Sequence, residues 1–327
     1  MNKKIKTALR HPLCALVVFI NNRKKILIKD DFKYLNILSK MTDLNMDLTH
    51  PLTFNSKLQY LKLHDRNPAY TEMVDKAAAK DYVVRTLKAA GVQAPEQYII
   101  PTLAQYRTWD EIDFAALPSQ FVLKCTHDSG GLVIVKNKDE FLADPARVRA
   151  AKRKLAKSLK RNFYYSGREW PYKNVPPRII AEKYMQNKDD AELMDYKIFC
   201  FAGQPKYIQV IANRRTNETI DFFDFNWEHQ PFTGLGLPEK PFAASPIPIP
   251  IHFKDMEKYA QILSKDMAFS RIDFYEINGK LYFGEITFYP ASGFGVFSSY
   301  DKNDKVDWNQ YLGDLIDLSL AYDNQKK

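Results

Sequence analysis

Apolar residues recur along the chain in short runs, and their spacing predicts strands and helices that are intermixed in clusters. Thr71–Ala90 is predicted to be one helix, because Thr71 is a suitable N-cap and Gly91 a suitable stop. Ala146–Arg161 is predicted to be a basic amphipathic helix. Runs typical of strands are Tyr98–Ile100, Phe121–Lys124, Leu132–Lys136, Arg178–Tyr184, Asp195–Phe201 and Gln204–Ala212, with a further helix at Lys254–Lys265 and a surface loop at Pro231–Pro250. The mixed clusters favour an α+β architecture over a doubly wound parallel sheet.

The segment 271–293 places two carboxylates on strands that are predicted to be adjacent. Asn278-Gly279 between two alternating runs is a strong hairpin signal. If the runs pair, Asp273 and Glu285 converge, and Thr287 adds a hydroxyl. Such oxygen ligands suit Mg²⁺. The alternative is an exposed hairpin whose acids are merely solvated.

Two further features indicate phosphate chemistry. Arg271 shares a strand face with Asp273, because side chains alternate along a strand. Lys124 ends a predicted strand, and the loop after it contains His127 and Ser129-Gly130-Gly131. Consecutive glycines let backbone N–H groups approach phosphate oxygens, although this is not a Walker loop. An ordinary β-turn and a structural histidine are the alternatives.

Two other strand segments carry candidate residues. The strand ending in Glu182, Lys183 and Tyr184 could offer backbone amides to an adenine edge, and an ordinary strand end is the alternative. Lys197 shares a strand face with Asp195 and could reach a phosphate; otherwise it is a surface lysine.

Composition narrows the class of protein. The chain has 327 residues, of which 45% are hydrophobic and 27% charged, as in soluble globular proteins. Three cysteines without metal spacing predict a reducing, cytoplasmic compartment. No apolar run approaches the roughly 20 residues that span a bilayer. Leu13–Ile20 is predicted to be a buried or membrane-surface helix.

The net charge of +9 is unevenly distributed. Residues 1–40 contain ten Lys/Arg against two acids, which leaves +8 there, and Arg147–Arg168 contains no acid. Such blocks attract anionic partners, although a solvated face is the simplest interpretation of any one block. Aromatic residues after the second block (Tyr164, Tyr165, Trp170 and Tyr172) would suit an acidic sugar polymer. Single-stranded nucleic acid is a less favoured partner, and a solvated helix with core aromatics is the other alternative.

Together, these segments resemble the ATP-grasp superfamily, and most closely its TupA-like branch, the teichuronopeptide type of bacterial surface-polysaccharide gene clusters. The resemblance runs from about Pro51 to the C-terminus and is carried by PLTFNSKLQYLKLHDRNPAYTEMVDKAAAKDYV, LPSQFVLKCTHDSGG, REWPYKNVPPRIIAEKY, DYKIFCFAGQPK and RIDFYEINGKLYFGEITFYPASG. It implies an ATP-grasp fold that holds the nucleotide between two α+β subdomains. The expected division is a basic segment at 1–50, an N-terminal subdomain at 51–115, a central lid at 116–183 and a C-terminal subdomain with the metal site at 184–327.

The resemblance also implies residue roles and the cofactors ATP and Mg²⁺. Lys76 resembles the first nucleotide-binding lysine, and Lys124 resembles the lysine that holds the α- and β-phosphates. His127 to Gly131 resemble the loop that closes over the γ-phosphate, and Glu182 to Tyr184 resemble the adenine-binding hinge. Arg271 resembles the arginine near the transferred phosphoryl group, and Asp273 and Glu285 resemble the Mg²⁺ ligands. Lys197 is expected to assist Arg271 in catalysis. Many ATP-grasp enzymes have asparagine where this chain has Thr287, so the third metal ligand stays open.

The implied activity is an ATP-dependent carboxylate–amine ligase that acts through an acyl phosphate. The expected partners are a uronic-acid glycan or its precursor and an amino acid or other amine, with peripheral contact to the inner face of an anionic membrane. Two alternatives remain open. One is a phosphotransferase with the same nucleotide site, and the other is a non-enzymatic glycan-binding or membrane-surface module.

Overall fold

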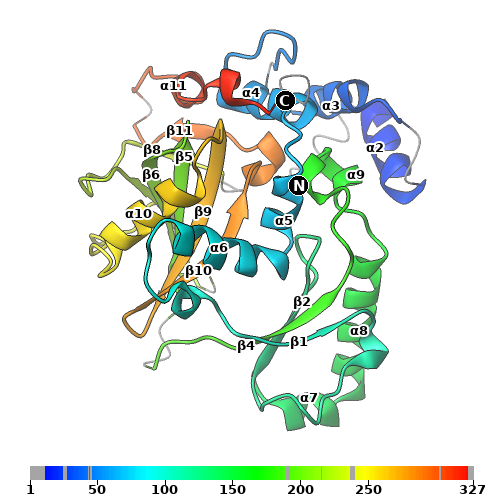
Figure 1. Ribbon diagram of the computed structural model, residues 1–327. Helices are drawn as coiled ribbons and strands as arrows, with labels where there is room; N and C mark the ends of the chain where they lie inside the picture. The colour runs from blue at the N-terminus through cyan, green and yellow to red at the C-terminus, as the bar shows by residue number, and fades with distance from the viewer. Residues whose placement is uncertain are drawn as a thin grey trace.

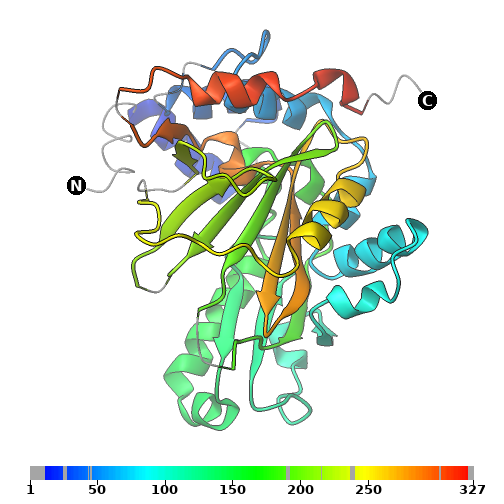
Figure 2. The ribbon, with the colours of Figure 1, turned by 90° about the vertical axis from the view of Figure 1, so that its left-hand side faces the viewer.

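Two antiparallel sheets form the body of the protein (Figures 1 and 2). The structure is a computed structural model and describes residues 12–24, 28–42, 44, 46–188, 192–214, 216–235, 240–301 and 303–322. The four-stranded sheet has the order β1 (Thr102–Tyr106), β4 (Ile179–Lys183), β2 (Phe121–Cys125), β3 (Leu132–Val135). The five-stranded sheet has the order β10 (Lys280–Thr287), β9 (Phe269–Ile277), β5 (Asp195–Phe201), β6 (Gln204–Ala212), β7 (Thr219–Phe223). This mixture of helices and antiparallel sheets confirms the predicted α+β class.

Helices cover both sheets. They are α2 (Pro12–Lys24), α3 (Asp31–Lys40), α4 (Phe54–His64), α5 (Ala69–Val74), α6 (Ala78–Ala89), α7 (Lys138–Ala143), α8 (Pro145–Leu159), α9 (Tyr164–Gly167), α10 (Phe253–Leu263) and α11 (Trp308–Asp314). Short 3₁₀ turns lie at Pro95–Tyr98, Trp109–Glu111, Trp170–Tyr172, Pro290–Gly293 and Leu318–Leu320, and a small sheet pairs β8 (Phe232–Gly234) with β11 (Phe297–Ser299).

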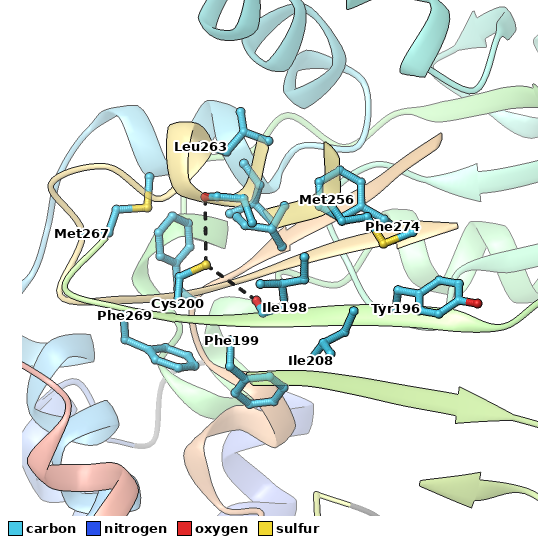
Figure 3. Close-up of a cluster of buried hydrophobic side chains, with 14 of the residues drawn as sticks. Tyr196, Ile198, Phe199, Cys200, Ile208, Met256, Leu263, Met267, Phe269 and Phe274 are labelled. Carbon is cyan, nitrogen blue, oxygen red and sulfur yellow. Dashed lines mark hydrogen bonds between the residues drawn. The ribbon is translucent and has the colours of Figure 1, made fainter. Parts of the chain in front are cut away.

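The larger hydrophobic core lies around the five-stranded sheet. Alternation along β5 sends Ile198 and Cys200 to one face and Phe199 to the other (Figure 3). Met256 and Leu263 of α10 pack on the first face, where Cys200 Sγ lies 3.9 Å from Ala260 O. Burial raises the pKa of the Cys200 thiol to about 12, so this cysteine is a small core residue.

The four-stranded sheet has a separate core with α7 and α8. Its members are Trp109, Ile112, Leu117, Phe121, Leu123, Cys125, Val135, Phe141, Ala151, Leu155, Ile179 and Ala181. Because β1 and Trp109 belong to it, this unit begins before the predicted boundary at 115/116.

The predicted helix Thr71–Ala90 is wrong as one element. It is divided into α5 and α6 at Asp75, whose backbone is extended (φ −72°, ψ 111°). Asp75 Oδ1 accepts a 3.0 Å hydrogen bond from Ala77 N, and Oδ2 pairs with Arg178 at 2.5 Å. A tertiary ion pair therefore stabilises the break, and a helical pattern does not reveal it.

Other predicted elements occur with small changes. The segment Tyr98–Ile100 forms the end of a 3₁₀ turn and one bridge from Ile99 to Phe283 instead of a full strand. The loop Pro231–Pro250 contains the short strand β8. The hairpin turn at Asn278-Gly279 is present, with φ of 53° and 69° as a type I′ turn requires.

The N-terminal helices are docked on the body through Asp31. Its carboxylate pairs with Arg66 at 3.1 Å and Arg168 at 3.2 Å, and it accepts a hydrogen bond from Tyr164 Oη. None of the described helices is long and apolar enough to cross a bilayer. The basic residues before Pro12 lie outside the described part of the chain.

Candidate active site

Strand register brings the predicted acids together on one face of the five-stranded sheet. Asp273 of β9 lies opposite Glu285 of β10 and opposite Lys197 of β5. Directly opposed residues share a sheet face. The next row on this face pairs Arg271 with Thr287.

Arg271 connects the members of this cluster. Its Nε donates to Asp273 Oδ1 at 2.7 Å, and its Nη2 donates to Glu285 Oε1 at 3.2 Å and Thr287 Oγ1 at 3.1 Å. Burial alone would lower the pKa of Arg271, but the neighbouring carboxylates outweigh it and raise the pKa. Lys197 Nζ donates to Asp273 Oδ2, so two cations face one buried carboxylate.

A bulge between Phe283 and Glu285 aims Glu285 into the site. The extra residue is Gly284, where a Cβ atom would lie 3.1 Å from Asp273 O and 3.1 Å from the Tyr275 ring. Glycine is therefore needed for the close approach of β9 and β10 at this point.

The donor set fits Mg²⁺. Among the described residues, no three His, Cys, Asp or Glu side chains form a metal group. Asp273, Glu285 and the Thr287 hydroxyl nevertheless supply hard oxygen ligands, and about 45% of the Glu285 side chain is exposed. Mg²⁺ usually takes one or two carboxylates and completes its shell with water and substrate phosphates. These three residues would hold the ion.

Lys76 lies in the break between α5 and α6. Its backbone N donates to Thr126 O at 3.1 Å, and its Nζ donates to Asp128 O at 2.5 Å. The break thus places Lys76 against the loop 126–131 between β2 and β3, here called the glycine loop. An unbroken helix would not place it there.

Glu182 is the buried counter-ion of two lysines. Its carboxylate pairs with Lys80 Nζ at 2.7 Å and Lys124 Nζ at 2.5 Å. Burial opposes ionisation of Glu182, but the two lysines outweigh it and lower its pKa. Glu182 therefore stays charged and fixes the position of Lys124.

Two cavities meet between the sheets. The smaller, about 90 Å³, has an apolar wall that includes Val74, Ile100 and Phe283. The larger, about 530 Å³, is lined by Ser129, Gly130, Gly131, Arg271 and Thr287, among others.

Three charged residues, Lys76, Lys124 and Glu285, line both cavities. Burial would raise the pKa of Glu285, but Arg271, Lys197 and the two shared lysines lower it, so its carboxylate is ionised. The two lysines and the ionised acid lie where the two cavities meet, here called the junction. Their charges suit a phosphate chain with a bound metal ion.

The glycine loop is attached to α8. Asp128 accepts hydrogen bonds from Ser158 Oγ and, at 3.3 Å, from Gly131 N. Gly130 has φ of +112°, which only glycine adopts readily. Ser129 and Gly130 are exposed at the cavity, as a mobile phosphate loop would require.

The structure does not bring His127 into the site. Its Nε2 lies 3.1 Å from Ser158 O and 3.0 Å from Arg161 O, so the buried ring caps the end of α8. These contacts favour the alternative of a structural histidine that anchors the loop, and a phosphate contact of His127 stays a prediction.

Four other predicted residues also lie off the cavity walls, and the first of them, Asp273, is only 2% exposed. The Lys183 amide donates to Pro101 O at 3.0 Å, so it is not offered to an adenine edge, and its side chain is exposed. Tyr184 does not line either cavity between the sheets, and Lys136 lies over its ring. Lys197 lies beside Asp273, where it positions the acid instead of reaching the cavities.

Sequence reasoning missed two cavity residues. Lys80 lies on α6, and its i, i+4 spacing from Lys76 within the predicted helix Thr71–Ala90 was the available signal. Glu169 is the first acid after the basic block and lines the larger cavity. Of the aromatic residues that were expected to contact an acidic sugar polymer, Tyr164 is buried and Tyr172 lines the larger cavity.

We expect Glu182→Gln to lower the free energy of unfolding by about 2 kcal/mol, because two lysines lose their counter-charge. The loss is limited because Lys124 is 30% exposed and can turn to water. Urea denaturation measures it. Glu72→Gln, which breaks an exposed pair with Arg85, is the control and should change stability by less than about 0.5 kcal/mol. Equal losses of stability in both variants would contradict the assignment of Glu182 as the buried counter-ion of two lysines.

Comparisons with known proteins identify a family for the chain. A profile of the TupA-like ATPgrasp family matches residues 56–317. No curated protein matches the chain. Solved structures similar to it include D-alanine–D-alanine ligase from Helicobacter pylori (14% identity, TM-score 0.34, 68% of this chain and 55% of that one). Others are the Bacillus anthracis D-alanine–D-alanine ligase complexed with ATP (16%, 0.35, 66% and 55%) and phosphoribosylamine–glycine ligase from Thermotoga maritima (12%, 0.35, 71% and 49%).

The chain thus spans about half the length of these solved proteins. The family match covers most of the sequence and includes every predicted site residue from Lys76 to Thr287. The protein belongs to the TupA-like ATP-grasp family and has the ATP-grasp fold.

Proposed function

We propose that the protein is an ADP-forming ligase that joins the carboxylate of a uronic-acid glycan, or of its precursor, to an amino acid or other amine. The observation that carries the proposal is the pair of cavities with a shared junction at Lys76, Lys124 and Glu285. The apolar wall of the smaller cavity suits a nucleobase, the junction suits the phosphates, and the larger cavity has room for an acceptor.

The residues at the junction supply positioning and charge. Lys76 and Lys124 would hold phosphate oxygens. Glu285 and Thr287, which line the larger cavity, would hold the metal together with Asp273, which is buried and does not line the cavity. When bound, Mg²⁺ neutralises charge on the phosphoryl group in transfer. Arg271 lies on the larger-cavity side, where it stabilises negative charge near the acceptor.

The proposed reaction has two balanced steps. An acceptor carboxylate oxygen forms a bond to the γ-phosphorus, and the bond to ADP breaks. The amine nitrogen then bonds to the acyl carbon and loses a proton, and phosphate leaves with the former carboxylate oxygen. The chain's own contribution is to hold the reactants together beside fixed cations.

The exposed face of α8 supports an acidic glycan as the acceptor. Arg149, Lys152, Arg153, Lys154 and Lys157 are all exposed on this helix. The bond from Ser158 to Asp128 connects the helix to the glycine loop. A polyanion bound along α8 would therefore lie near the larger cavity.

An ADP-release screen that crosses uronic-acid glycans with amino acids tests the proposed function. ADP formation that needs both partners, with an amide product, supports the ligase. A phosphorylated acceptor formed without an amine would show a phosphotransferase instead. No turnover with any pair, although the protein binds glycan, would favour a non-catalytic module.

We also propose that α2 contacts an anionic membrane surface. Leu13 is 77% exposed, and Leu16 and Phe19 are about half exposed. The segment 1–40 carries a charge of +8, which complements anionic lipid. Apolar side chains within a basic segment are typical of interfacial helices.

Leu13→Glu is expected to weaken binding to vesicles of phosphatidylglycerol about tenfold, because the insertion of one leucine contributes roughly 1.5–3 kcal/mol. Co-sedimentation measures the bound fraction. Ile251→Glu is the matched control, since Ile251 is 78% exposed but lies far from α2 in the sequence. Vesicle binding that does not depend on the content of anionic lipid, or an equal loss of binding in both variants, would refute the membrane contact.

A further inference from the structure

The larger cavity has walls of opposite charge. Lys76, Lys124 and Arg271 make one part of the lining cationic. Glu169 supplies a carboxylate elsewhere on the wall, with Phe163 and Tyr172 as aromatic neighbours. Phosphate binding accounts for the three cationic residues of the lining but not for Glu169.

Glu169 differs from the other acids that line this cavity. Asp128 is engaged by Ser158 and the glycine loop, and Glu285 belongs to the metal cluster. Glu169 is only 6% exposed, so its burial needs a compensating charge.

Lys62 provides that charge from behind the wall. Lys62 is 1% exposed and does not line the cavity. Its Nζ donates to Ser292 Oγ at 3.2 Å, and the Ser292 hydroxyl is also hydrogen-bonded to Glu169. Burial raises the pKa of Glu169, and Lys62 opposes that shift without occupying the cavity side of the carboxylate.

We propose that Glu169 binds the ammonium group of the amine co-substrate. This inference rests on the proposed ligase function and adds the location and charge of the second substrate. An anionic acceptor is repelled by Glu169 and attracted to the lysines, whereas a primary ammonium prefers the carboxylate. The rings of Phe163 and Tyr172 favour a cation and cover a short carbon chain.

Isothermal titration of the full-length protein with alaninamide, in the presence of Mg²⁺ and a non-hydrolysable ATP analogue, tests the proposal. Wild-type protein should bind alaninamide at least tenfold more tightly than its uncharged analogue propionamide. Glu169→Gln should weaken alaninamide binding at least tenfold and leave nucleotide affinity within twofold. Glu169→Asp, which keeps the charge, should retain part of the affinity.

The comparison of alaninamide with propionamide uses wild-type protein only, so the proposal can still be tested if Glu169→Gln does not fold. Equal binding of alaninamide and propionamide, or no alaninamide binding at millimolar concentrations, would overturn the proposal. If the nucleotide analogue still binds in that case, the nucleotide site stands and only the ammonium site fails. If the analogue does not bind wild-type protein, the proposed function itself fails, and the ammonium site fails with it.

Discussion

Replacement of Glu285 with glutamine is expected to abolish nucleotide turnover, with a fall of about 10³-fold in kcat. Glu285 lines both cavities and is the more exposed of the two acids that are predicted to bind the metal. A neutral amide in its place removes a charged metal ligand while Arg271 and the lysines remain, so the metal-bound phosphates lose their main attachment. ADP release under saturating Mg²⁺ and ATP measures the effect.

Glu276→Gln is the matched control for this substitution. Glu276 lies on the same hairpin but accepts a hydrogen bond from His252 N at 3.0 Å, outside the two cavities. Its turnover should stay within about twofold of wild type. Because Glu285 is partly exposed, Glu285→Gln should unfold at nearly the wild-type urea concentration. Full turnover by this variant would show that the hairpin acids are not the metal site.

Replacement of Lys62 with methionine is expected to lower the free energy of unfolding by about 4 kcal/mol. Lys62 Nζ donates to Gln59 Oε1 on the same helix at 2.9 Å, and to Gly167 O and Ser292 O at 2.8 Å each, and so joins α4 to two distant segments. Methionine keeps the volume but leaves Gly167 O without this donor and, below the lowered pKa of Lys62, leaves Glu169 buried without its cation. Urea denaturation followed by circular dichroism measures the loss.

Lys57→Met on the same helix is the control. Lys57 is only partly buried and has one described acceptor, Ile316 O at 2.9 Å, so we expect a loss of about 1 kcal/mol. The double variant Lys62→Met/Glu169→Gln should be more stable than the sum of the single losses predicts, because the uncompensated charge is gone. Strict additivity would show that Lys62 and Glu169 are not coupled.

The pH dependence of stability gives a second test of Lys62. Burial lowers the pKa of Lys62 to about 7 from its usual 10.5, although Glu169 opposes the shift. Between these values the unfolded chain binds more protons than the folded one, so this residue makes stability rise with pH. Lys62→Met should remove that rise. A wild-type profile that is flat or falling across this interval would contradict the lowered pKa.

Local patterns in the sequence were sufficient for the hairpin and its acids. Asn278-Gly279 determined the turn, and alternation along the strands then placed Asp273 and Glu285 on one face. The role of Thr287 as third ligand and of Arg271 as a phosphate contact stay predictions, although both lie in the same hydrogen-bonded cluster.

Features that depend on distant contacts could not be predicted in this way. The break at Asp75 needs Arg178, and the turn of His127 away from the cavity needs the carbonyls at the end of α8. The pairing of Glu182 with Lys80 depends on how α6 packs beside β4. Lys62 contacts residues 105 and 230 positions away, so a single-sequence pattern carries no signal for it.

Oxygen transfer from the acceptor tests the ligase most directly. A glycan that supports ADP release would be labelled with ¹⁸O in its uronic-acid carboxylate and incubated with ATP, Mg²⁺ and the amine. A ligase of the proposed kind must place one labelled oxygen in each inorganic phosphate released, with an amide as the second product. Phosphate without label, or label retained in a phosphorylated glycan, would contradict the central claim.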